Sequence, residues 1–252
     1  MDDSNLEIGE SREIAPGVTV ERRSVIQLLT GAAAALALPL TPRLLAGETA
    51  RGTLTFDEFL AEANPIAGKL VADTTLAGQD RYLLTLASLA VRLADVEVPE
   101  LRDSEQGVGP GTFVGFNPGG DPFTVLHWKM QPNSAIRLHA HTYGNVVTLG
   151  LEGEAMVENF EMEGDPDFTL KTRFSVRRTR AQLLTPGGVN LVNLKRDYIH
   201  GMTAGAKGAR GLDITTKIRE KEPTPYLDLA RKPLSASGQV YEAAWVFDAP
   251  KS

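Results

Sequence analysis

From residue 103 onward, the sequence is divided into short runs in which apolar and polar residues alternate, and this pattern limits the fold most strongly. The segment FTLKTRFSV, residues 168–176, alternates apolar or β-branched side chains with Thr, Lys, Arg and Ser, as a half-buried strand does. Turn-forming clusters such as QPNS, EGDPD, TPGG and GAKGA separate these runs. Strands that follow one another without intervening helices predict a β-sandwich or barrel over residues 103–220.

The residues before this region have a helical pattern. TFDE, residues 55–58, is a capping-box sequence that predicts a helix start. A second start is predicted where Asn64 would cap the helix and Pro65 would occupy its first position. A third helix, predicted over residues 79–94, has one apolar stripe made of Tyr82, Leu83, Leu86, Leu89, Ala90 and Leu93. Residues 47–102 are therefore expected to form a small helical cap whose role is packing.

The N-terminal residues 1–46 have the pattern of an export signal. Arg22 and Arg23 precede an apolar run at residues 28–40 that is shorter than the roughly 20 residues needed to span a bilayer. The segment resembles a twin-arginine signal peptide, which implies recognition by the twin-arginine (Tat) export machinery and a periplasmic or secreted location. A buried alanine-rich helix or an uncleaved anchor is the alternative. At the other end, residues 221–252 are expected to form an extension that packs on the barrel.

Composition limits the chemistry that the chain can perform. The net charge is −6, the pI is about 5.3, and there is no long run of like charge, so nucleic-acid binding is not expected. The sequence contains no cysteine, which excludes disulfides, thiolate nucleophiles, iron–sulfur clusters and cysteine zinc sites. Any bound metal must therefore use His, Asp or Glu side chains.

Three of the four histidines have the spacing of a metal site. His139 and His141 stand one residue apart in RLHAHTYG, so in a strand both imidazoles share a face and can bind one ion at about 2.0–2.1 Å. His200 follows TPGGVNLVNLKRDYI, at a distance that lets a later antiparallel strand return beside the first. We predict a divalent metal held by these three residues. The alternative is that they are hydrogen-bonded strand and loop residues without a metal.

The surrounding motifs resemble those of a known superfamily. HAHTYGNVVTLGLEGEA, followed by a PGG turn and a distant histidine, resembles the two motifs of the cupins, and Gly153 matches the glycine that ends the first. Asn145 and Val146 stand where the common cupin pattern has a glutamate ligand. The absence of this glutamate is a feature of the cupins related to cysteine dioxygenase. The segment FTVLHWKMQPNSAIRLHAH also resembles the strand and turn that precede their histidine pair. The resemblance covers roughly residues 55–218 and is strongest around residues 123–160.

This resemblance implies a mostly β protein, a cupin double-stranded β-helix of jelly-roll type with a small N-terminal helical cap. It also implies a small-molecule substrate, O2 and Fe(II) held by three histidines, with Mn, Ni and Zn as other metals, and a homodimer as one assembly. The family's Ser–His–Tyr relay is replaced, since GLDITT puts Asp213 and Thr215 in the corresponding places. Arg102 and Arg210 are the candidates for the arginine that captures the substrate carboxylate.

Four other polar residues have two interpretations each. Tyr143 has the parity of the histidine pair and is a candidate catalytic residue pointing into the pocket, with barrel packing as the alternative. Asp213 is a candidate to orient a ligand imidazole, or it is a solvated charge at a strand end. His127 is expected outside the site, in a surface or hydrogen-bonded position, because its parity is opposite to that of apolar neighbours. Asn145 is interpreted as a turn residue rather than a weak ligand.

Two functions follow from the sequence. The first is an exported non-haem iron dioxygenase that acts on a small substrate, with oxidation of a thiol to a sulfinate as one case. The second is a metal-containing cupin that binds or isomerises a small ligand without redox chemistry. The missing relay argues against the first function, whereas the missing glutamate argues for it.

Overall fold

A computed structural model describes residues 52–94, 96–104, 108–117, 120–220 and 224–247. The export signal predicted for residues 1–46 lies outside these residues. In the part of the chain that is described, no helix is long and apolar enough to cross a membrane.

Two helices precede the sheet in the described residues: α1 (Phe56–Ala72) and α2 (Leu76–Ala90). The predicted capping box is present, because the Thr55 hydroxyl accepts from the Glu58 backbone N–H and the Glu58 carboxylate accepts from the Thr55 N–H. The predicted helix break at Asn64 is wrong, since Pro65 lies inside α1. The helix continues past it because one face on both sides of the proline is buried, at Phe59, Ala63, Ala67 and Leu70.

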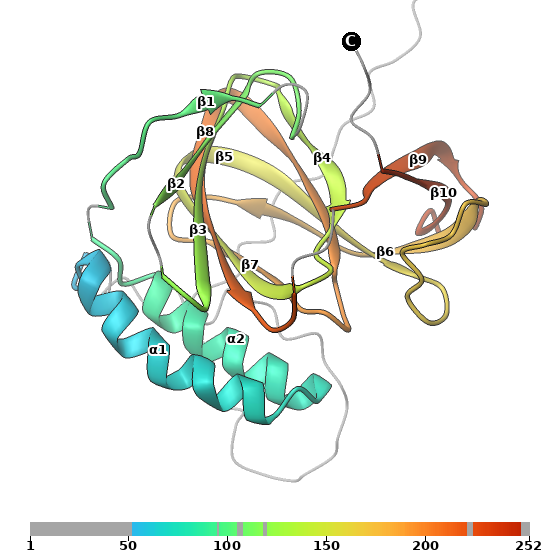
Figure 1. The fold of residues 1–252 in the computed structure, drawn as a ribbon. Helices are drawn as coiled ribbons and strands as arrows, with labels where there is room; N and C mark the ends of the chain where they lie inside the picture. The colour runs from blue at the N-terminus through green and yellow to red at the C-terminus, as the bar shows by residue number, and fades with distance from the viewer. Residues whose placement is uncertain (1–51, 95, 105–107, 118–119, 221–223, 248–252) are drawn as a thin grey trace, which may run out of the picture. The chain divides into compact units, whose positions relative to one another are not determined.

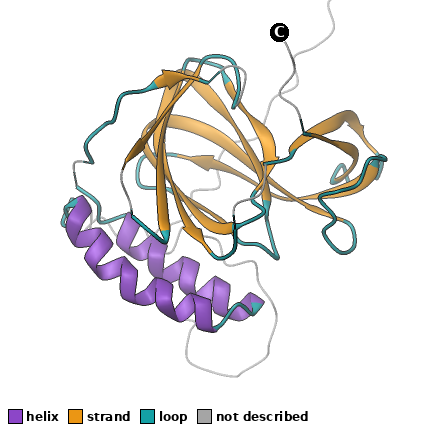
Figure 2. Ribbon diagram, in the orientation of Figure 1, coloured by secondary structure: helices purple, strands orange, loops and turns teal. Residues whose placement is uncertain are grey.

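The rest of the described chain forms a mostly antiparallel sheet that closes into a barrel (Figures 1 and 2). The strands lie in the order β1-β2-β3-β8-β4-β9-β10-β6-β5-β7, and an additional pairing of β8 with β5 closes the ring. The predicted fold class, mostly β with a small N-terminal helical cap, is confirmed. The strands are β1 (Arg102–Asp103), β2 (Thr112–Asn117), β3 (Phe123–Met130), β4 (Ala135–Ala140), β5 (Gly144–Met162), β6 (Phe174–Leu184), β7 (Val189–Val192), β8 (Ile199–Lys217), β9 (Tyr226–Pro233) and β10 (Val240–Val246).

The GAKGA segment, predicted as a turn, and the LEG segment that contains Gly153 both lie inside long strands. The strands β5 and β8, of 19 residues each, continue through the LEG and GAKGA segments. At this level Gly153 and Gly208 have φ angles of 65° and 78°, and the pairing register shifts on either side of Gly153. The glycines therefore bend the paired strands without interrupting them.

The alternating segment that begins at Phe168 is strand only in its second half, because β6 starts at Phe174. Before that point the Asp167 carboxylate accepts hydrogen bonds from the backbone and hydroxyl of Thr169, a local turn that competes with sheet pairing. The Phe168 ring packs at 5.6 Å from the ring of Trp245, measured between centroids. Alternation alone could not predict this, because the turn and a contact with a distant aromatic residue decide it.

The C-terminal segment supplies two strands of the sheet. The strand β9 pairs with β4, with Tyr226 opposite His139, and β10 pairs with β6. Figure 1 shows β9 and β10 side by side next to β6. The predicted extension is thus part of the sheet and borders β4, the strand that carries His139.

The strands β3, β5 and β8 have one face toward the helices and one toward the barrel interior. Leu149 and Leu212, directly opposite each other in β5 and β8, pack in one cluster with Leu83 and Leu86 of α2. The Tyr82 hydroxyl of the same helix lies 2.6 Å from the Thr216 hydroxyl. A second cluster fills the interior with Trp128, Met130, Ile136, Ala155, Val157 and Met202. Side chains alternate along each strand, so a polar residue next to a helix-facing residue points into the barrel interior.

We expect Gly153→Ala to destabilise the barrel far more than Gly164→Ala. Both glycines have positive φ, for which a side chain costs about 1–2 kcal/mol. A Cβ at Gly153 would also collide with the backbone carbonyl oxygen of Gly208, which adds about 1–3 kcal/mol, whereas a Cβ at Gly164 meets open space. Urea unfolding followed by circular dichroism measures both losses. Equal losses would show that the bend between β5 and β8 tolerates a side chain.

Candidate metal centre

The three histidines predicted as metal ligands converge on one point. The register pairs His139 of β4 directly with His200 of β8, and His141 follows two residues later with the same parity. The Nε2 atoms of His139 and His141 lie 3.2 Å apart, and those of His141 and His200 lie 2.9 Å apart. One ligand atom from each of the three residues lies within 4.8 Å of the others. Two neighbouring strands therefore bring three imidazole nitrogens together.

The spacing of these nitrogens fits a divalent ion. Two nitrogens bound to one ion at about 2.1 Å and at a right angle are about 3.0 Å apart, close to both short separations. Without a metal, three neutral imidazoles would not be stable with their Nε2 atoms this close together. Two unprotonated nitrogens repel each other, and at most one N–H can bridge each pair. The donor set, three nitrogens without a carboxylate, suits first-row divalent metals.

The protein favours the neutral form of each ligand. Burial lowers the pKa of His139, and burial together with the neighbouring histidines lowers the pKa of His141 and His200 well below the usual range. The His139 Nδ1 lies 2.8 Å from the backbone carbonyl of Arg137, so it is the nitrogen that carries the proton and Nε2 keeps its lone pair. In His200, Nδ1 is buried without a hydrogen-bond partner in the described part of the chain.

Two buried asparagines support the strand that carries His200. Asn159 lies opposite His200 in the pairing of β5 with β8. Its side-chain amide donates to the Asn190 side chain and to the backbone carbonyl of Asp197, and Asn190 donates back at 2.6 Å. These bonds tie β7 and the segment before His200 to the barrel interior.

Helix α2 also holds this segment, a role that its apolar stripe did not indicate. Asp80 accepts a hydrogen bond from the Asn193 side chain and forms an ion pair with Arg196 at 2.9 Å. Gln79 accepts from the backbone N–H of Leu194. The helical cap thus positions the chain a few residues before His200. The sequence signal for this was the polar pair Gln79-Asp80 at the start of an otherwise apolar helix.

The other predicted site residues lie in three different environments. Asn145 is not in a turn, because it is the second residue of β5. Its side-chain oxygen accepts a hydrogen bond from the Leu194 N–H, so this oxygen is occupied and does not act as a metal ligand. Tyr143 is half-buried, with a pKa raised by burial and by Asp213. Asp213 is buried, not a solvated strand-end charge, and burial raises its pKa to about 6 despite opposing contributions from Thr148 and Trp128.

His127 lies outside the triad, but it is neither on the surface nor hydrogen-bonded. It is fully buried, and neither ring nitrogen has a partner among the described residues. Burial lowers its pKa to about 4, so the ring is neutral. The strand parity was interpreted correctly, but His127 pairs with Leu212 on the face that the helices cover. Both faces of β3 are buried, which a single strand pattern does not reveal.

Arg137 lies near the triad, and the sequence pattern did not single it out. Its guanidinium carbon lies 4.1 Å from the ring centroid of Tyr226, and that ring lies 6.2 Å from the His139 ring. Its Nη1 is buried without a hydrogen-bond partner in the described residues. The two arginines expected from the resemblance instead form ion pairs, Arg102 with Glu100 and Arg210 with Glu152.

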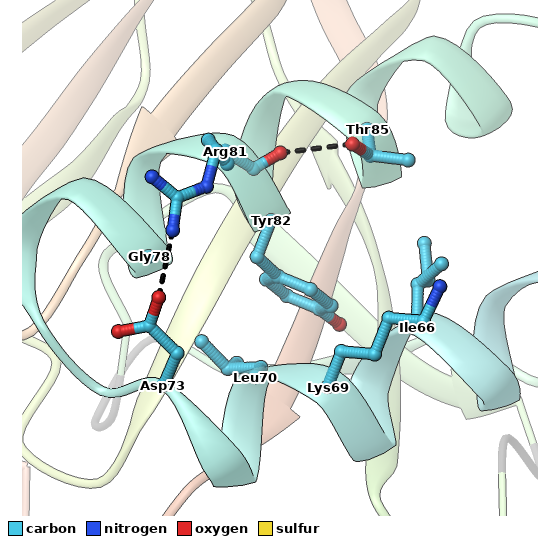
Figure 3. A pocket seen from close by; sticks show the side chains of 8 residues that line it. All are labelled: Ile66, Lys69, Leu70, Asp73, Gly78, Arg81, Tyr82 and Thr85. Atoms are coloured by element: carbon cyan, nitrogen blue, oxygen red, sulfur yellow. Dashed lines mark hydrogen bonds and ion pairs between the residues drawn. The ribbon is translucent and has the colours of Figure 1, made fainter.

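A separate pocket lies between the two helices and contains none of the triad (Figure 3). It has a volume of about 320 Å³ and is lined by residues of α1 and α2, including Lys69 and Tyr82. Across its opening, Arg81 and Asp73 form an ion pair at 2.7 Å. Two of its three charged side chains, Arg81 and Asp73, pair with each other, and nothing in it points to a ligand.

Comparison with known proteins finds similarity in structure only. No protein-family model matches the sequence, and no curated protein does. KdgF from a Halomonas species is similar at 16% identity and a TM-score of 0.34, and the match covers 48% of this chain and 88% of the KdgF chain. The polyketide cyclase RemF from Streptomyces resistomycificus is similar at 17% and 0.35, covering 54% and 79%. A cupin-like protein from Thermotoga maritima is similar at 16% and 0.35, covering 49% and 82%.

These neighbours include cupins, but at such low identities and TM-scores the likeness carries no argument about function. The functional interpretation therefore rests on the geometry of the histidine site.

We expect one metal ion per chain, lost when any member of the triad is replaced. His139→Ala, His141→Ala and His200→Ala should each lower metal occupancy at least about tenfold, because two imidazoles bind far more weakly than three. His127→Ala is the control: it removes a buried imidazole of the same size outside the triad and should retain the metal. Elemental analysis of the purified proteins measures all four. Equal metal content in the four variants would exclude the triad as the site.

Proposed function

We propose that the chain binds one divalent metal through His139, His141 and His200 and acts as a non-haem iron dioxygenase on a small substrate. The observation that carries this proposal is the set of three imidazole nitrogens from His139 in β4, His141 just after β4 and His200 in β8, which no carboxylate among the described residues joins. Asn145, at the position of the common glutamate ligand, is bonded to the backbone of Leu194 instead. Three ligands on one side leave the opposite side of an ion open to exchangeable partners.

A ferrous ion at this centre would supply one-electron chemistry and open positions for O2 and a substrate donor atom. The protein's own contribution is to hold three neutral imidazoles in fixed orientations, with His200 buried and His139 and His141 partly buried. The Arg137 carbonyl orients His139, and the strand pairing orients His200.

Arg137 is suited to binding an anionic group of the substrate. Its guanidinium stacks on Tyr226, close to His139, and keeps a buried N–H group for a further acceptor. A guanidinium binds a carboxylate in a planar, two-pronged arrangement, which would fix the substrate's orientation at the metal. A small carboxylate with a sulfur donor, such as a thiol acid, satisfies both the metal and Arg137.

The alternative function is a non-redox metal cupin that binds or isomerises a small ligand. One observation favours it: Asp213 is a buried carboxyl whose pKa of about 6 suits the transfer of a proton near neutral pH. By resemblance, Asp213 stands at one position of the Ser–His–Tyr relay that the related thiol dioxygenases use, and it replaces the relay residue there. Metal content measured together with oxygen consumption separates the two functions.

We expect iron-loaded protein to consume O2 only when a small metal-binding substrate is present. Cysteine, cysteamine and 3-mercaptopropionate are the thiols to compare, with an oxygen electrode and product mass as readouts. Zinc-loaded protein should keep its fold but show no turnover, because Zn(II) does not change its oxidation state. Absence of oxygen uptake with every thiol by fully iron-loaded protein would favour the non-redox function.

The same assay tests the role of Arg137. Arg137→Gln should lower kcat/KM about tenfold for 3-mercaptopropionate, which carries a carboxylate, and leave cysteamine, which carries none, almost unchanged. Arg102→Gln serves as the control, since that side chain is exposed and pairs with Glu100. A loss of the same size for both thiols would assign Arg137 a structural role only.

We also propose that residues 1–46 direct export through the twin-arginine route and are then removed. Arg22, Arg23 and the apolar run at residues 28–40 support this proposal. N-terminal sequencing of the protein purified from its producing cell should find a start near residue 47. An intact Met1 in a soluble cytoplasmic pool would contradict export, and Arg22→Lys with Arg23→Lys should abolish processing if the route is correct.

A further inference from the structure

Three polar atoms from three adjacent strands meet in the barrel interior without bonding to one another. They are Oδ1 of Asp213 in β8, Oγ1 of Thr148 in β5 and Nε1 of Trp128 in β3, and none has a hydrogen-bond partner among the described residues. Their residues are 6%, 0% and 1% exposed, so bulk solvent does not satisfy them. An unsatisfied polar atom in the interior loses its hydrogen bonds to water without replacement, and three of them together require an explanation.

The strand pairing places the three residues on the same face. Thr148 lies directly opposite Asp213 in the pairing of β5 with β8. Trp128 pairs with Gly211, two residues before Asp213 and therefore on the same side of β8. A Cβ at Gly211 would collide with the Trp128 ring, so the glycine makes room for the indole to lie across β8. The bare backbone at Gly211 thus brings the indole N–H toward Asp213.

The Thr148 and Trp128 side chains lower the pKa of Asp213 as hydrogen-bonding groups directed at its carboxyl group, against the larger effect of burial. None of the three nevertheless reaches hydrogen-bond geometry with another. Polar groups that converge in this way share a partner placed between them, because each would otherwise lose its hydrogen bond to water without replacement.

The same interior continues to the triad. Thr148 lies opposite Asn190 in the pairing of β5 with β7, and Asn190 bonds to Asn159, which lies opposite His200. The Trp128 ring also packs in the interior cluster with Met202, two residues after His200. The interior face of β5, β7 and β8 therefore carries polar residues from the cluster as far as His200.

We propose that Asp213, Thr148 and Trp128 form a second subsite in the barrel interior, one that binds a hydroxyl group of the ligand held at the triad. This inference rests on the proposed function, since it takes the other end of the ligand to be at the metal. It adds the chemical class of the substrate, a small molecule with a metal-binding group at one end and an alcohol at the other.

The donors and acceptors of the cluster select a hydroxyl over other polar groups. Ionised Asp213 only accepts, the Trp128 N–H only donates, and the Thr148 hydroxyl does both. An alcohol donates to the carboxylate and accepts from the indole, so it satisfies all three. An ammonium group has no lone pair for the Trp128 N–H, and a second carboxylate is repelled by Asp213.

Matched probes test this selection. Each set shares one carboxylate for the metal centre and differs at the far end: butyrate, 4-hydroxybutyrate, 4-aminobutyrate and succinate, with the three- and five-carbon equivalents. Binding to zinc-loaded protein is measured by calorimetry. At the chain length that spans the two sites, the hydroxy acid should bind about tenfold more tightly than the unsubstituted, amino and dicarboxylic acids.

Two nearly isosteric variants identify the residues responsible. Asp213→Asn and Thr148→Val should each abolish the advantage of the hydroxy acid, while Thr215→Val, a buried threonine on the same face of β8, should keep it. Retention of zinc by all variants shows that they are folded. An equal affinity of all acids at every length, as expected if the cluster holds only water, would overturn the subsite, and so would an advantage that survives both variants.

Trp128 provides a second readout that does not depend on the metal. The chain has two tryptophans, so Trp245→Phe leaves Trp128 as the single emitter. In metal-free protein at millimolar probe, the hydroxy acid should shift Trp128 emission to longer wavelength and the unsubstituted acid should not. Absence of metal from wild-type protein would contradict the proposed function alone, whereas metal-loaded protein with no hydroxyl-specific shift and no hydroxyl preference would contradict the subsite alone.

Discussion

The antiparallel pairing of β5 with β8 is the interaction on which the rest of this structure depends. Along this pairing, Asn159 lies opposite His200 at one end and Thr148 lies opposite Asp213 further along. Because side chains alternate along both strands, these polar residues face the interior while Leu212 faces the helices. A single register therefore fixes His200, the polar cluster and the apolar layer that faces the helices. A slip of one residue would turn all of them to the opposite face.

The helical cap contributes more than a cover for one face of the barrel. Through Tyr82 it bonds to Thr216 near the end of β8, and through Asp80 it bonds to Asn193 in the segment before the start of β8. The helix thus holds both ends of the strand that carries His200. Movement of α2 would be transmitted to the third metal ligand, whereas His139 and His141 depend on β4 and its neighbours.

Local sequence rules were sufficient where the controlling interaction is local. The capping box at Thr55 and the shared face of His139 and His141 follow from geometry within a few residues, and both are present. The rules failed where a distant contact overrides the local preference. Pro65 did not end its helix because packing on both sides maintains it, and the segment before Phe174 left the strand pattern because of a turn at Asp167.

The sequence by itself determined the class of fold and the two histidines that share a face, because each depends on alternation or on residue identity. Only the tertiary structure decided that His127 is buried, that Arg137 lies by the triad and that Asp213 meets Trp128 and Thr148. The physical reason is that alternation states which side chains share a face of one strand. It does not state which strand lies beside it, in what register, or what covers the other face.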